Sequence, residues 1–210
     1  LYYIICPEYS AEIRFVGGTG MIEFQNVSFA YDSGDHAGQL NHISFKIPDG
    51  QVVLICGESG CGKTTLTRLM NGLIPNYYDG RLEGDIFIDG KSVTEKPLYE
   101  MASLVGSVFQ NPRSQFFAVD TNSELAFGCE NLGIPEKEII ARMGKRVTEL
   151  HIEPLMNRSI FALSGGEKQK IACASAAMIE PDIFVLDEPS SNLDIKAIRD
   201  LAEVIALWKK

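Results

Sequence analysis

Alternating and continuous apolar segments along the chain predict a series of short strands. The segment Met21–Tyr31 alternates, with Ile22, Phe24 and Val27 apolar, which is typical of a strand with one buried face. Val52–Cys56 is apolar throughout, as the strands of buried parallel sheets are. The strands predicted in this way are Met21–Tyr31, His42–Ile47, Gln51–Cys56, Arg81–Gly90, Ser103–Gln110 and Ile183–Asp187.

Helical patterns lie between and after these strands. A helix is expected from Lys63 to about Asn71, and Thr121–Leu150 is mainly helical. Glu167 follows Ser164 by three residues, the pattern of a capping box at the start of a helix. The alternation of strands and helices indicates an α/β fold, with a largely parallel sheet and helices on both faces. A last helix from about Leu193 has an apolar stripe at Ile198, Leu201, Ile205 and Trp208.

The composition fits one α/β domain and argues against several classes of protein. The chain has 210 residues, 45% of them hydrophobic, which is enough for one sizeable core. Its net charge of -9 disfavours a nucleic-acid partner, because such a partner requires a basic face. No apolar run approaches the roughly 18 residues that span a bilayer. The five cysteines, without a CxxC pair, indicate reduced thiols rather than a disulfide framework or a zinc site.

The first 20 residues differ from the rest of the chain. Val16–Gly20 is typical of a turn or linker, and the regular strand pattern begins only at Met21. The opening LYYIICPEYS lacks the basic region and the small-residue cleavage site of a signal peptide. We therefore interpret residues 1–20 as an upstream segment or linker.

A glycine-rich loop follows a buried strand and precedes a helix. Gly57–Thr64 (GESGCGKT) fits the phosphate-loop pattern G-x-x-x-x-G-K-[ST] at every position. Its glycines let backbone N–H groups surround phosphate oxygens, and the helix N-terminus adds unpaired donors. Lys63 is expected to contact the β- and γ-phosphates, and Thr64 to bind Mg²⁺. The predicted nucleotide-binding residues of this loop are Gly57, Ser59, Gly60, Cys61, Gly62, Lys63, Thr64 and Thr65.

Two further segments carry candidate chemistry. Asp187 and Glu188 end an apolar strand; in isolation they fit two solvated carboxylates, but behind a phosphate loop a catalytic role is the better interpretation. In the run LSGGEKQ, Ser164 caps a helix, and Gly165 and Gly166 leave its N-terminal amides bare. Such a helix start is a second anion-binding site.

The phosphate loop, LSGGEKQ and IFVLDEP occur in an order and spacing that resemble the nucleotide-binding domain of ABC ATPases. The resemblance implies a P-loop NTPase fold with a mostly parallel core sheet, an N-terminal antiparallel β subdomain and a helical signature subdomain. The domain would cover residues 21–210, with the helical part at about 112–180. ATP and Mg²⁺ are the implied ligands. A second ABC ATPase domain is the implied partner, because Ser164 and Gly166 would hold the γ-phosphate bound to the partner's Lys63.

Single positions also match the family motifs. Gln110 in VFQNP matches the glutamine that contacts Mg²⁺ and water and senses the membrane partner. Asp194 in SSNLD matches a residue that crosses the dimer interface, and Tyr31 matches the aromatic residue that stacks on adenine. A packed or turn tyrosine also explains Tyr31. The resemblance assigns Glu188, Gln110 and Lys63 to catalysis, with Glu188 as the general base. It assigns Thr64, Gln110 and Asp187 to the metal. The remaining positions that it assigns to the nucleotide are Tyr31, Ser164, Gly165, Gly166 and Asp194.

The segment Phe109–Pro135 narrows the resemblance. Its QNPxxQ run and the following ELAFG resemble the ATPases of energy-coupling-factor importers, which take up vitamins or cobalt and nickel ions. This implies a peripheral place on the cytoplasmic face of the cell membrane and a transmembrane coupling subunit as partner. Phe116, Phe117 and Phe127 are candidates for the apolar groove that receives it. Core packing explains Phe127 equally well.

One departure from the family concerns the switch histidine, which ends a strand after the D-loop helix. No histidine follows His151, and the chain stops at Lys210. We therefore hypothesise a C-terminally truncated domain whose sheet lacks a central strand, with weak stability and impaired hydrolysis.

A soluble ABC ATPase, ribosome-associated or regulatory, is the alternative. The interval between Lys63 and Ser164 leaves no room for the long coiled coil of chromosome-type members. The acidic balance disfavours a basic ribosome-facing linker. Intact Glu188 and LSGG disfavour a regulatory protein that binds nucleotide without hydrolysing it.

Overall fold

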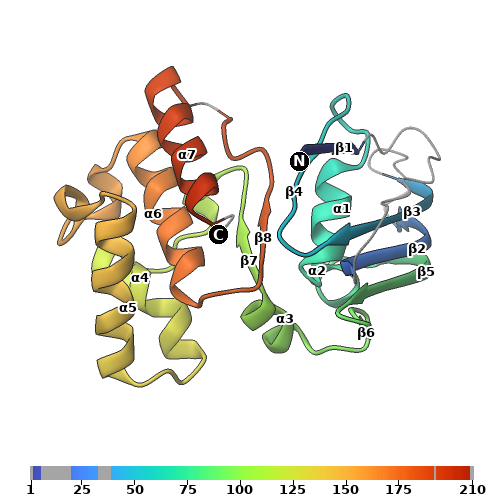
Figure 1. Ribbon diagram of the computed structural model, residues 1–210, viewed down its shortest axis with the longest axis horizontal. Helices are drawn as coiled ribbons and strands as arrows, with labels where there is room; N and C mark the ends of the chain where they lie inside the picture. Colours follow the sequence, from blue (N-terminus) through green and yellow to red (C-terminus); the bar gives the residue numbers. More distant parts are fainter. Residues whose placement is uncertain (1, 6–19, 33–38, 192, 209–210) are drawn as a thin grey trace. The chain divides into compact units, whose positions relative to one another are not determined.

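The computed structural model describes residues 2–5, 20–32, 39–191 and 193–208. The chain forms two compact units, 1–102 and 103–208, and each is described by itself (Figure 1). Helix α3 (Leu98–Leu104) contains the junction between them. No helix in these ranges is long and apolar enough to cross a membrane.

The first unit contains the antiparallel sheet predicted for the N-terminal part. β2 (Gly20–Tyr31) lies between β3 (Leu40–Pro48) and β5 (Gly80–Ile88). β5 also pairs with β6 (Lys91–Ser92) through the turn that the Asp-Gly pair predicts. The sheet order is therefore β3-β2-β5-β6, and the antiparallel subdomain is confirmed.

The buried face of β2 agrees with its apolar pattern. Ile22, Phe24 and Val27 are all buried, and Phe24 stacks on Phe45 of β3 with ring centroids 4.5 Å apart. Phe24 and Val27 are separated by three positions, which strict alternation would place on opposite faces. A register shift between these two residues, with Asn26 at φ +51°, returns Val27 to the buried face.

A parallel pair of strands carries the glycine-rich loop. β4 (Val52–Ile55) pairs with β1 (Tyr2–Ile5) from Tyr2↔Val52 to Ile5↔Ile55. β4 leads through the loop into α1 (Lys63–Met70), and the short α2 (Leu73–Asn76) follows. Part of the segment that we interpret as a linker thus forms a strand, and its residues 6–19 lie outside the described ranges.

A second parallel pair begins the other unit. β7 (Val105–Val108) pairs with β8 (Ile183–Leu186) in parallel, so that Val108 lies opposite Leu186. The predicted strand Ser103–Gln110 was two residues too long at each end, because Ser103 and Leu104 belong to α3 and β7 ends at Val108. Pro97 marks the start of α3, since its carbonyl accepts the N–H groups of Glu100 and Met101.

Four helices make up most of the second unit as described. They are α4 (Thr121–Asn131), α5 (Glu136–Glu149), α6 (Gly165–Met178) and α7 (Ile195–Trp208). Helix α6 packs against the other three, as Figure 1 shows. Its buried residues lie on all sides of the helix, which is typical of a fully enclosed helix and agrees with its many alanines. Short 3-10 turns lie at Pro112–Ser114, Glu153–Leu155 and Ile160–Ala162.

The core of the second unit joins these helices to the strand pair. Leu125, Ile152 and Ile171 are completely buried within one cluster. Trp208 at the end of α7 stacks on Phe184 of β8, with centroids 3.9 Å apart. The predicted stripe of α7 is confirmed at Leu201, Ile205 and Trp208, which pack in the core, whereas Ile198 is 42% exposed.

Candidate functional site

The phosphate loop connects β4 to α1 in the first unit. Gly60 and Gly62 have φ values of +84° and +98°, which other residues rarely adopt. Gly62 caps α1 and has no side chain, so no capping side chain competes with a ligand for the first amides of the helix. Lys63 Nζ donates to the carbonyl oxygens of Gly57 and Glu58 at 3.0 and 2.7 Å. The ammonium group therefore lies over the loop that its own segment forms.

Tyr31 lies beside this loop. Its hydroxyl is 3.2 Å from Oγ1 of Thr65, which is buried in the first turn of α1. The end of β2 is thereby tied to the start of α1. Two predicted nucleotide-binding residues, distant in sequence, are thus neighbours in the structure.

Gln110 and Glu188 lie close together in the second unit, each two residues beyond the end of a paired parallel strand. Gln110 Nε2 donates to Oε2 of Glu188 at 2.9 Å. Asp187 continues the pairing, because its N–H donates to the carbonyl of Val108 at 2.9 Å. The carboxyl ends of β7 and β8 thus bring together the amide and both predicted acids.

Glu188 has an unusual backbone conformation. Its φ is +44°, a costly value for a residue with a β-carbon. Ser191 holds the same residue through two hydrogen bonds: its N–H donates to the Glu188 carbonyl at 2.9 Å, and its hydroxyl to Oε2 at 3.2 Å. Strain retained at a carboxylate is a feature of functional sites.

The LSGG segment begins helix α6 with the predicted capping box. Ser164 Oγ accepts from the Glu167 N–H, and the Glu167 carboxylate accepts from the Ser164 N–H at 2.7 Å. Arg158 also donates to Glu167, at 3.1 Å. The hydrogen bond from the Ser164 N–H is the main reason why the pKa of Glu167 lies below its ordinary value, and Arg158 lowers it further. The carboxylate is therefore engaged by Ser164 and Arg158 at the helix start.

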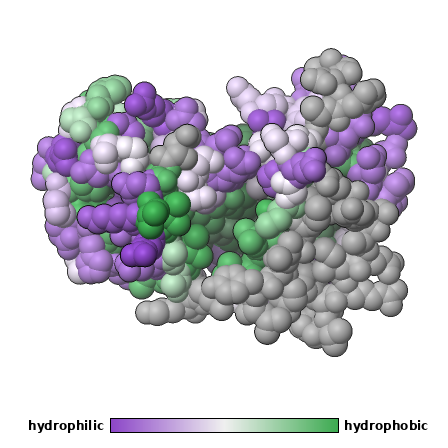
Figure 2. Space-filling model, turned by 90° about the horizontal axis from the view of Figure 1, so that it is seen from above, coloured by the Kyte–Doolittle hydropathy of each residue, from purple (hydrophilic) through white to green (hydrophobic). Residues whose placement is uncertain are grey.

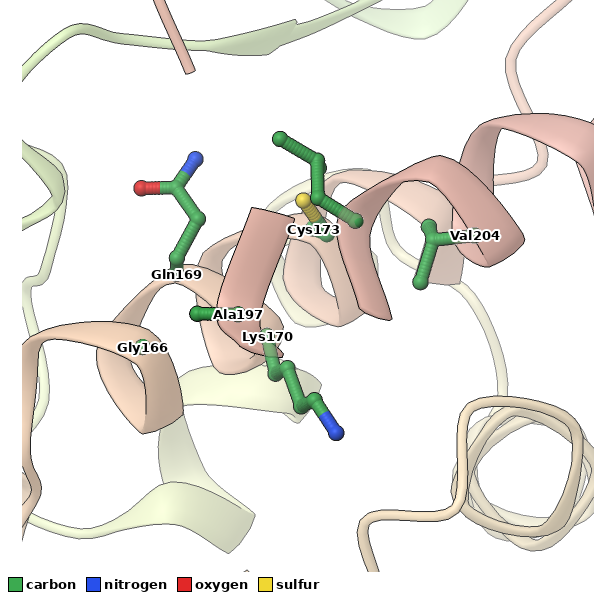
Figure 3. Close-up of a pocket in the computed structure, with 7 residues that line it drawn as sticks. Gly166, Gln169, Lys170, Cys173, Ala197 and Val204 are labelled. Atoms are coloured by element: carbon green, nitrogen blue, oxygen red, sulfur yellow. The ribbon is translucent and has the colours of Figure 1, made fainter. Parts of the chain in front are cut away.

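The two glycines of this segment have different surroundings. A Cβ at Gly165 would meet no atom within 4 Å, whereas one at Gly166 would lie 2.9 Å from Cβ of Ala197. Figure 3 shows Ala197 of α7 next to the α6 residues Gly166 and Gln169. Gly166 is thus required for close packing of α6 and α7, a role that sequence reasoning missed. Asp194 caps α7 by accepting from the Ala197 N–H at 2.8 Å.

Other residues near the site were not assigned a role from the sequence. Gln115 accepts from the Phe109 N–H at 3.1 Å and donates to the carbonyls of Ser107 and Ala172. It therefore joins the end of β7 to α6. The buried Glu124 accepts from the N–H groups of Phe117 and Ala118, each at 2.9 Å. The QNPxxQ and ELAFG patterns contained both residues, but nothing in the patterns indicated these partners.

The predicted site residues divide between the two units. Tyr31 and the phosphate loop belong to the first, and Gln110, Ser164–Gly166, Asp187, Glu188 and Asp194 belong to the second.

Comparison with known proteins identifies the family. Residues 40–191 match the model of the ABC transporter family. The chain belongs to this family. A Treponema denticola protein named as an ABC transporter ATP-binding protein is 53% identical over 185 residues, which cover 88% of this chain and 38% of that protein. The energy-coupling factor transporter ATP-binding protein EcfA1 of Lactococcus lactis is 36% identical over 185 residues, which cover 88% of this chain and 65% of that protein.

A solved structure confirms the fold. The cbiO1 protein of Clostridium perfringens, described as part of the ABC transporter complex cbiONQ, has a TM-score of 0.77 at 29% identity, covering 90% of this chain and 74% of that one. The P-loop NTPase fold of ABC ATPases is thus confirmed. The chain spans only about a third of the length of the first curated relatives, from 38% in Treponema denticola to 30% in Methanosarcina acetivorans.

Proposed function

We propose that this domain binds and hydrolyses ATP as the nucleotide-binding part of an ABC importer of the energy-coupling-factor type. The observation that carries the proposal is the Gln110–Glu188 pair. A strained carboxylate, held by an amide at the ends of two parallel strands, accompanies a complete phosphate loop in the same domain. This combination supports hydrolysis rather than nucleotide binding alone.

The residues of the first unit fit a triphosphate. The loop offers backbone donors beside Gly60 and Gly62, and a Cβ at Gly60 would meet no atom within 4 Å, so the loop surface is open there. Lys63 would exchange its loop carbonyls for phosphate oxygens, which form stronger charge-assisted hydrogen bonds. Tyr31 would lie against the adenine, since its hydroxyl contacts Thr65 next to the loop.

The oxygen donors also fit Mg²⁺, a hard cation that prefers such ligands. In the first unit, Thr64 offers its hydroxyl. In the second unit, Asp187 offers its carboxylate and Gln110 its amide oxygen, because Nε2 of Gln110 is directed to Glu188. The ion, when bound, neutralises charge that develops on the phosphates.

Glu188 would act as the general base. Gln110 and Ser191 both donate to its Oε2, so Oε1 is left to orient a water molecule and accept its proton. The fixed φ of Glu188 restricts the directions in which this carboxylate can point. Hydrolysis of the γ-phosphate by that water is the expected reaction.

A second ABC ATPase domain is proposed as partner. The capped start of α6 leaves free N–H donors next to Ser164, and Gly165 is open to contact. A helix start of this kind attracts a phosphate group. We assign this surface to the γ-phosphate held by the partner's Lys63, which would make ATP the link between two domains.

A transmembrane coupling subunit is the other proposed partner, with the domain on the cytoplasmic face of the membrane. A pocket of about 260 Å³ in the second unit is lined by Arg113, Phe116, Ala118, Ile160, Phe161 and Lys168. Phe161 of this lining is 78% exposed, and Phe117, which lies between the lining residues Phe116 and Ala118 in the chain, is 74% exposed. Figure 2 shows hydrophobic residues interrupting the hydrophilic surface of this unit. A pocket lined by apolar side chains together with Arg113 and Lys168 suits an amphipathic coupling helix.

The stacking of Phe117 on Phe127 refines this surface. Their ring centroids are 4.8 Å apart with planes 12° from parallel, and Phe127 is only partly exposed. Phe127 therefore supports Phe117 from below, while Phe116 packs against the core. Import rather than export is supported by the similarity to EcfA1.

The proposal is tested by measuring MgATP binding and phosphate release with the wild-type protein and with Glu188→Gln. We expect both proteins to bind MgATP, and only the wild type to release phosphate. If Glu188→Gln binds MgATP and releases phosphate at the wild-type rate, the catalytic assignment of Glu188 is overturned. Absence of MgATP binding would overturn the proposal as a whole.

The membrane partner is tested by co-purification with a transmembrane coupling subunit of the energy-coupling-factor type. Phe161→Ser should reduce recovery of the complex and leave MgATP affinity unchanged. Ile140→Ser, on the exposed side of α5 and also highly exposed, is the matched control. Equal recovery with Phe161→Ser and wild type would contradict the docking assignment.

A further inference from the structure

Arg68 has contacts next to the phosphate loop for which the proposed mechanism has no use. Its Nη1 donates to the hydroxyl of Tyr31 at 2.9 Å. The same hydroxyl lies 3.2 Å from Oγ1 of Thr65, three residues earlier on α1. Residues three apart lie on the same face of a helix. The Tyr31 hydroxyl is therefore held by two groups on one face of α1.

Tyr78 in turn holds Arg68. The guanidinium carbon lies 4.0 Å from the centroid of the Tyr78 ring, within the range of a cation–π contact. Among the residues that the structure describes, no carboxylate forms an ion pair with Arg68. Its side-chain contacts in the described part of the chain are with the hydroxyl and ring of Tyr31 and with the ring of Tyr78. A planar guanidinium suits both at once, because it donates in its plane and stacks with its face.

The Arg68 guanidinium lies over the ring of Tyr31 as well, with its carbon 6.0 Å from the centroid. The aromatic neighbours of this ring both approach it edge-on. Phe29 approaches it at 87° with centroids 4.8 Å apart, and Tyr78 at 83° with centroids 6.3 Å apart. Both contacts are nearly perpendicular, so no aromatic ring in the described part of the chain stacks parallel to it. A planar base is the kind of group that would complete such a site.

We infer that Arg68 and Tyr78 are positioning residues for the nucleobase: they fix the hydroxyl of Tyr31, so that its ring is oriented to stack on the base. This inference rests on the proposed function, in which Tyr31 contacts adenine. The phosphates are contacted separately by Lys63 and the loop. Loss of Arg68 should therefore weaken ligands that carry a base and spare ligands that consist of phosphate alone.

The test compares MgATP with magnesium tripolyphosphate in calorimetric titrations of the whole chain. Arg68→Met and Tyr31→Phe both remove the Arg68–Tyr31 hydrogen bond, and Tyr31→Phe also removes the contact with Thr65. Each variant should weaken MgATP binding about three- to tenfold. Their tripolyphosphate affinity should equal that of the wild type. The MgATP affinity of the double variant should fall no further than that of the more weakly binding single variant, since both substitutions act through the Arg68–Tyr31 bond. Arg68→Lys, which keeps the charge and a donor, should recover part of the loss.

Arg81→Met is the matched control. Arg81 follows Gly80, the cross-strand partner of Tyr31, so its side chain points to the opposite face of the sheet. It is 81% exposed and pairs with Glu83. This variant should bind both ligands as the wild type does.

Tyr31→Ala separates the inference from the proposed function. We expect it to weaken MgATP on the order of tenfold or more, the cost of losing one stacked base. If Tyr31→Ala has no effect on MgATP, the assignment of Tyr31 to the base fails, and the inference with it. If Tyr31→Ala weakens MgATP but Arg68→Met does not, the inference alone is overturned. Equal losses for MgATP and tripolyphosphate in Arg68→Met would also overturn it.

Discussion

The phosphate loop and the Glu188 site are held in place in different ways. Lys63 donates to carbonyls only six and five residues earlier in the chain. Glu188 accepts its hydrogen bond from Gln110, 78 residues earlier. The cationic part of the proposed chemistry is therefore formed by one short segment, whereas the acidic part requires β7 and β8 to pair.

Because of this difference, nucleotide binding and hydrolysis should depend on the folded structure to different degrees. A local loop keeps its geometry if its strand and helix are present. The Glu188 site depends on strand register and on the core behind it, because both strand ends must meet. Changes in the packing of the second unit should therefore impair hydrolysis before they impair nucleotide binding.

The largest effect is expected for Glu188→Gln. Removing the general base should lower the rate of phosphate release by about 10²- to 10⁴-fold, while MgATP affinity stays within about twofold. Single-turnover phosphate release and calorimetry measure the two quantities. Ser190→Ala, at a neighbouring exposed residue, is the control and should retain its rate. A large loss of affinity in Glu188→Gln would mean that the two regions are not separable.

Lys63→Met, in contrast to Glu188→Gln, should mainly lower the affinity for MgATP. Loss of a charge-assisted contact to phosphate should weaken MgATP binding on the order of 10- to 100-fold. The thermal unfolding midpoint should change little, because Lys63 contacts only its own loop among the described residues. A Lys63→Met protein that unfolds at a much lower temperature would contradict the view of the loop as a local device.

Gly106→Ala tests whether the Glu188 site depends on the packing of the strand pair β7–β8. A Cβ at Gly106 in β7 would lie 2.7 Å from Cγ of Pro181 and 3.1 Å from the Ala176 carbonyl oxygen. We expect the free energy of unfolding of the second unit to fall by about 1–3 kcal/mol, measured by urea denaturation. Hydrolysis should be reduced more than MgATP binding.

Gly144→Ala is the matched control for this experiment. Gly144 lies in the interior of α5, and a Cβ there would meet no atom within 4 Å. Alanine should stabilise this helix by about 0.5–1 kcal/mol. If Gly106→Ala is as stable as Gly144→Ala, the strand pair is less tightly packed than the distances indicate.

The smallest effect concerns Glu167 and pH. Its pKa lies below the ordinary value of 4.5, chiefly because the Ser164 N–H donates to the carboxylate. A lowered pKa in the folded state adds stability above the unfolded pKa, and this stability is lost as the pH falls through the folded pKa. The difference in urea midpoint between wild type and Glu167→Gln should therefore shrink as the pH is lowered below about 4.5. A constant difference would show that the charge of Glu167 is not involved.

Several elements were predictable because their signals are local. The capping box at Ser164 and Glu167 is present, since both partners lie within one helical turn. The strand–loop–helix order around Gly57–Thr65 and the hairpin after β5 are likewise confirmed. Helix α3 was missed, because only Pro97 marks its start.

The contacts of Arg68, Gln115 and Ser191 could not be predicted in this way. Arg68 contacts Tyr31 across 37 positions, and Gln115 contacts Ala172 across 57. Ser191 lies near Glu188 in sequence, but its contact depends on the positive φ of Glu188, which the run DEP does not reveal. Side-chain partners of this kind follow from how elements pack.

The sequence by itself determined the family, the phosphate loop and the capped start of α6, because each depends on residues that are close in the chain and whose backbone chemistry is local. Only the tertiary structure decided that Gln110 holds Glu188, that Gly166 packs against Ala197, and that Arg68 and Tyr78 hold Tyr31. These arrangements depend on strand register and helix packing, in which the free energy is shared among many residues far apart in the chain.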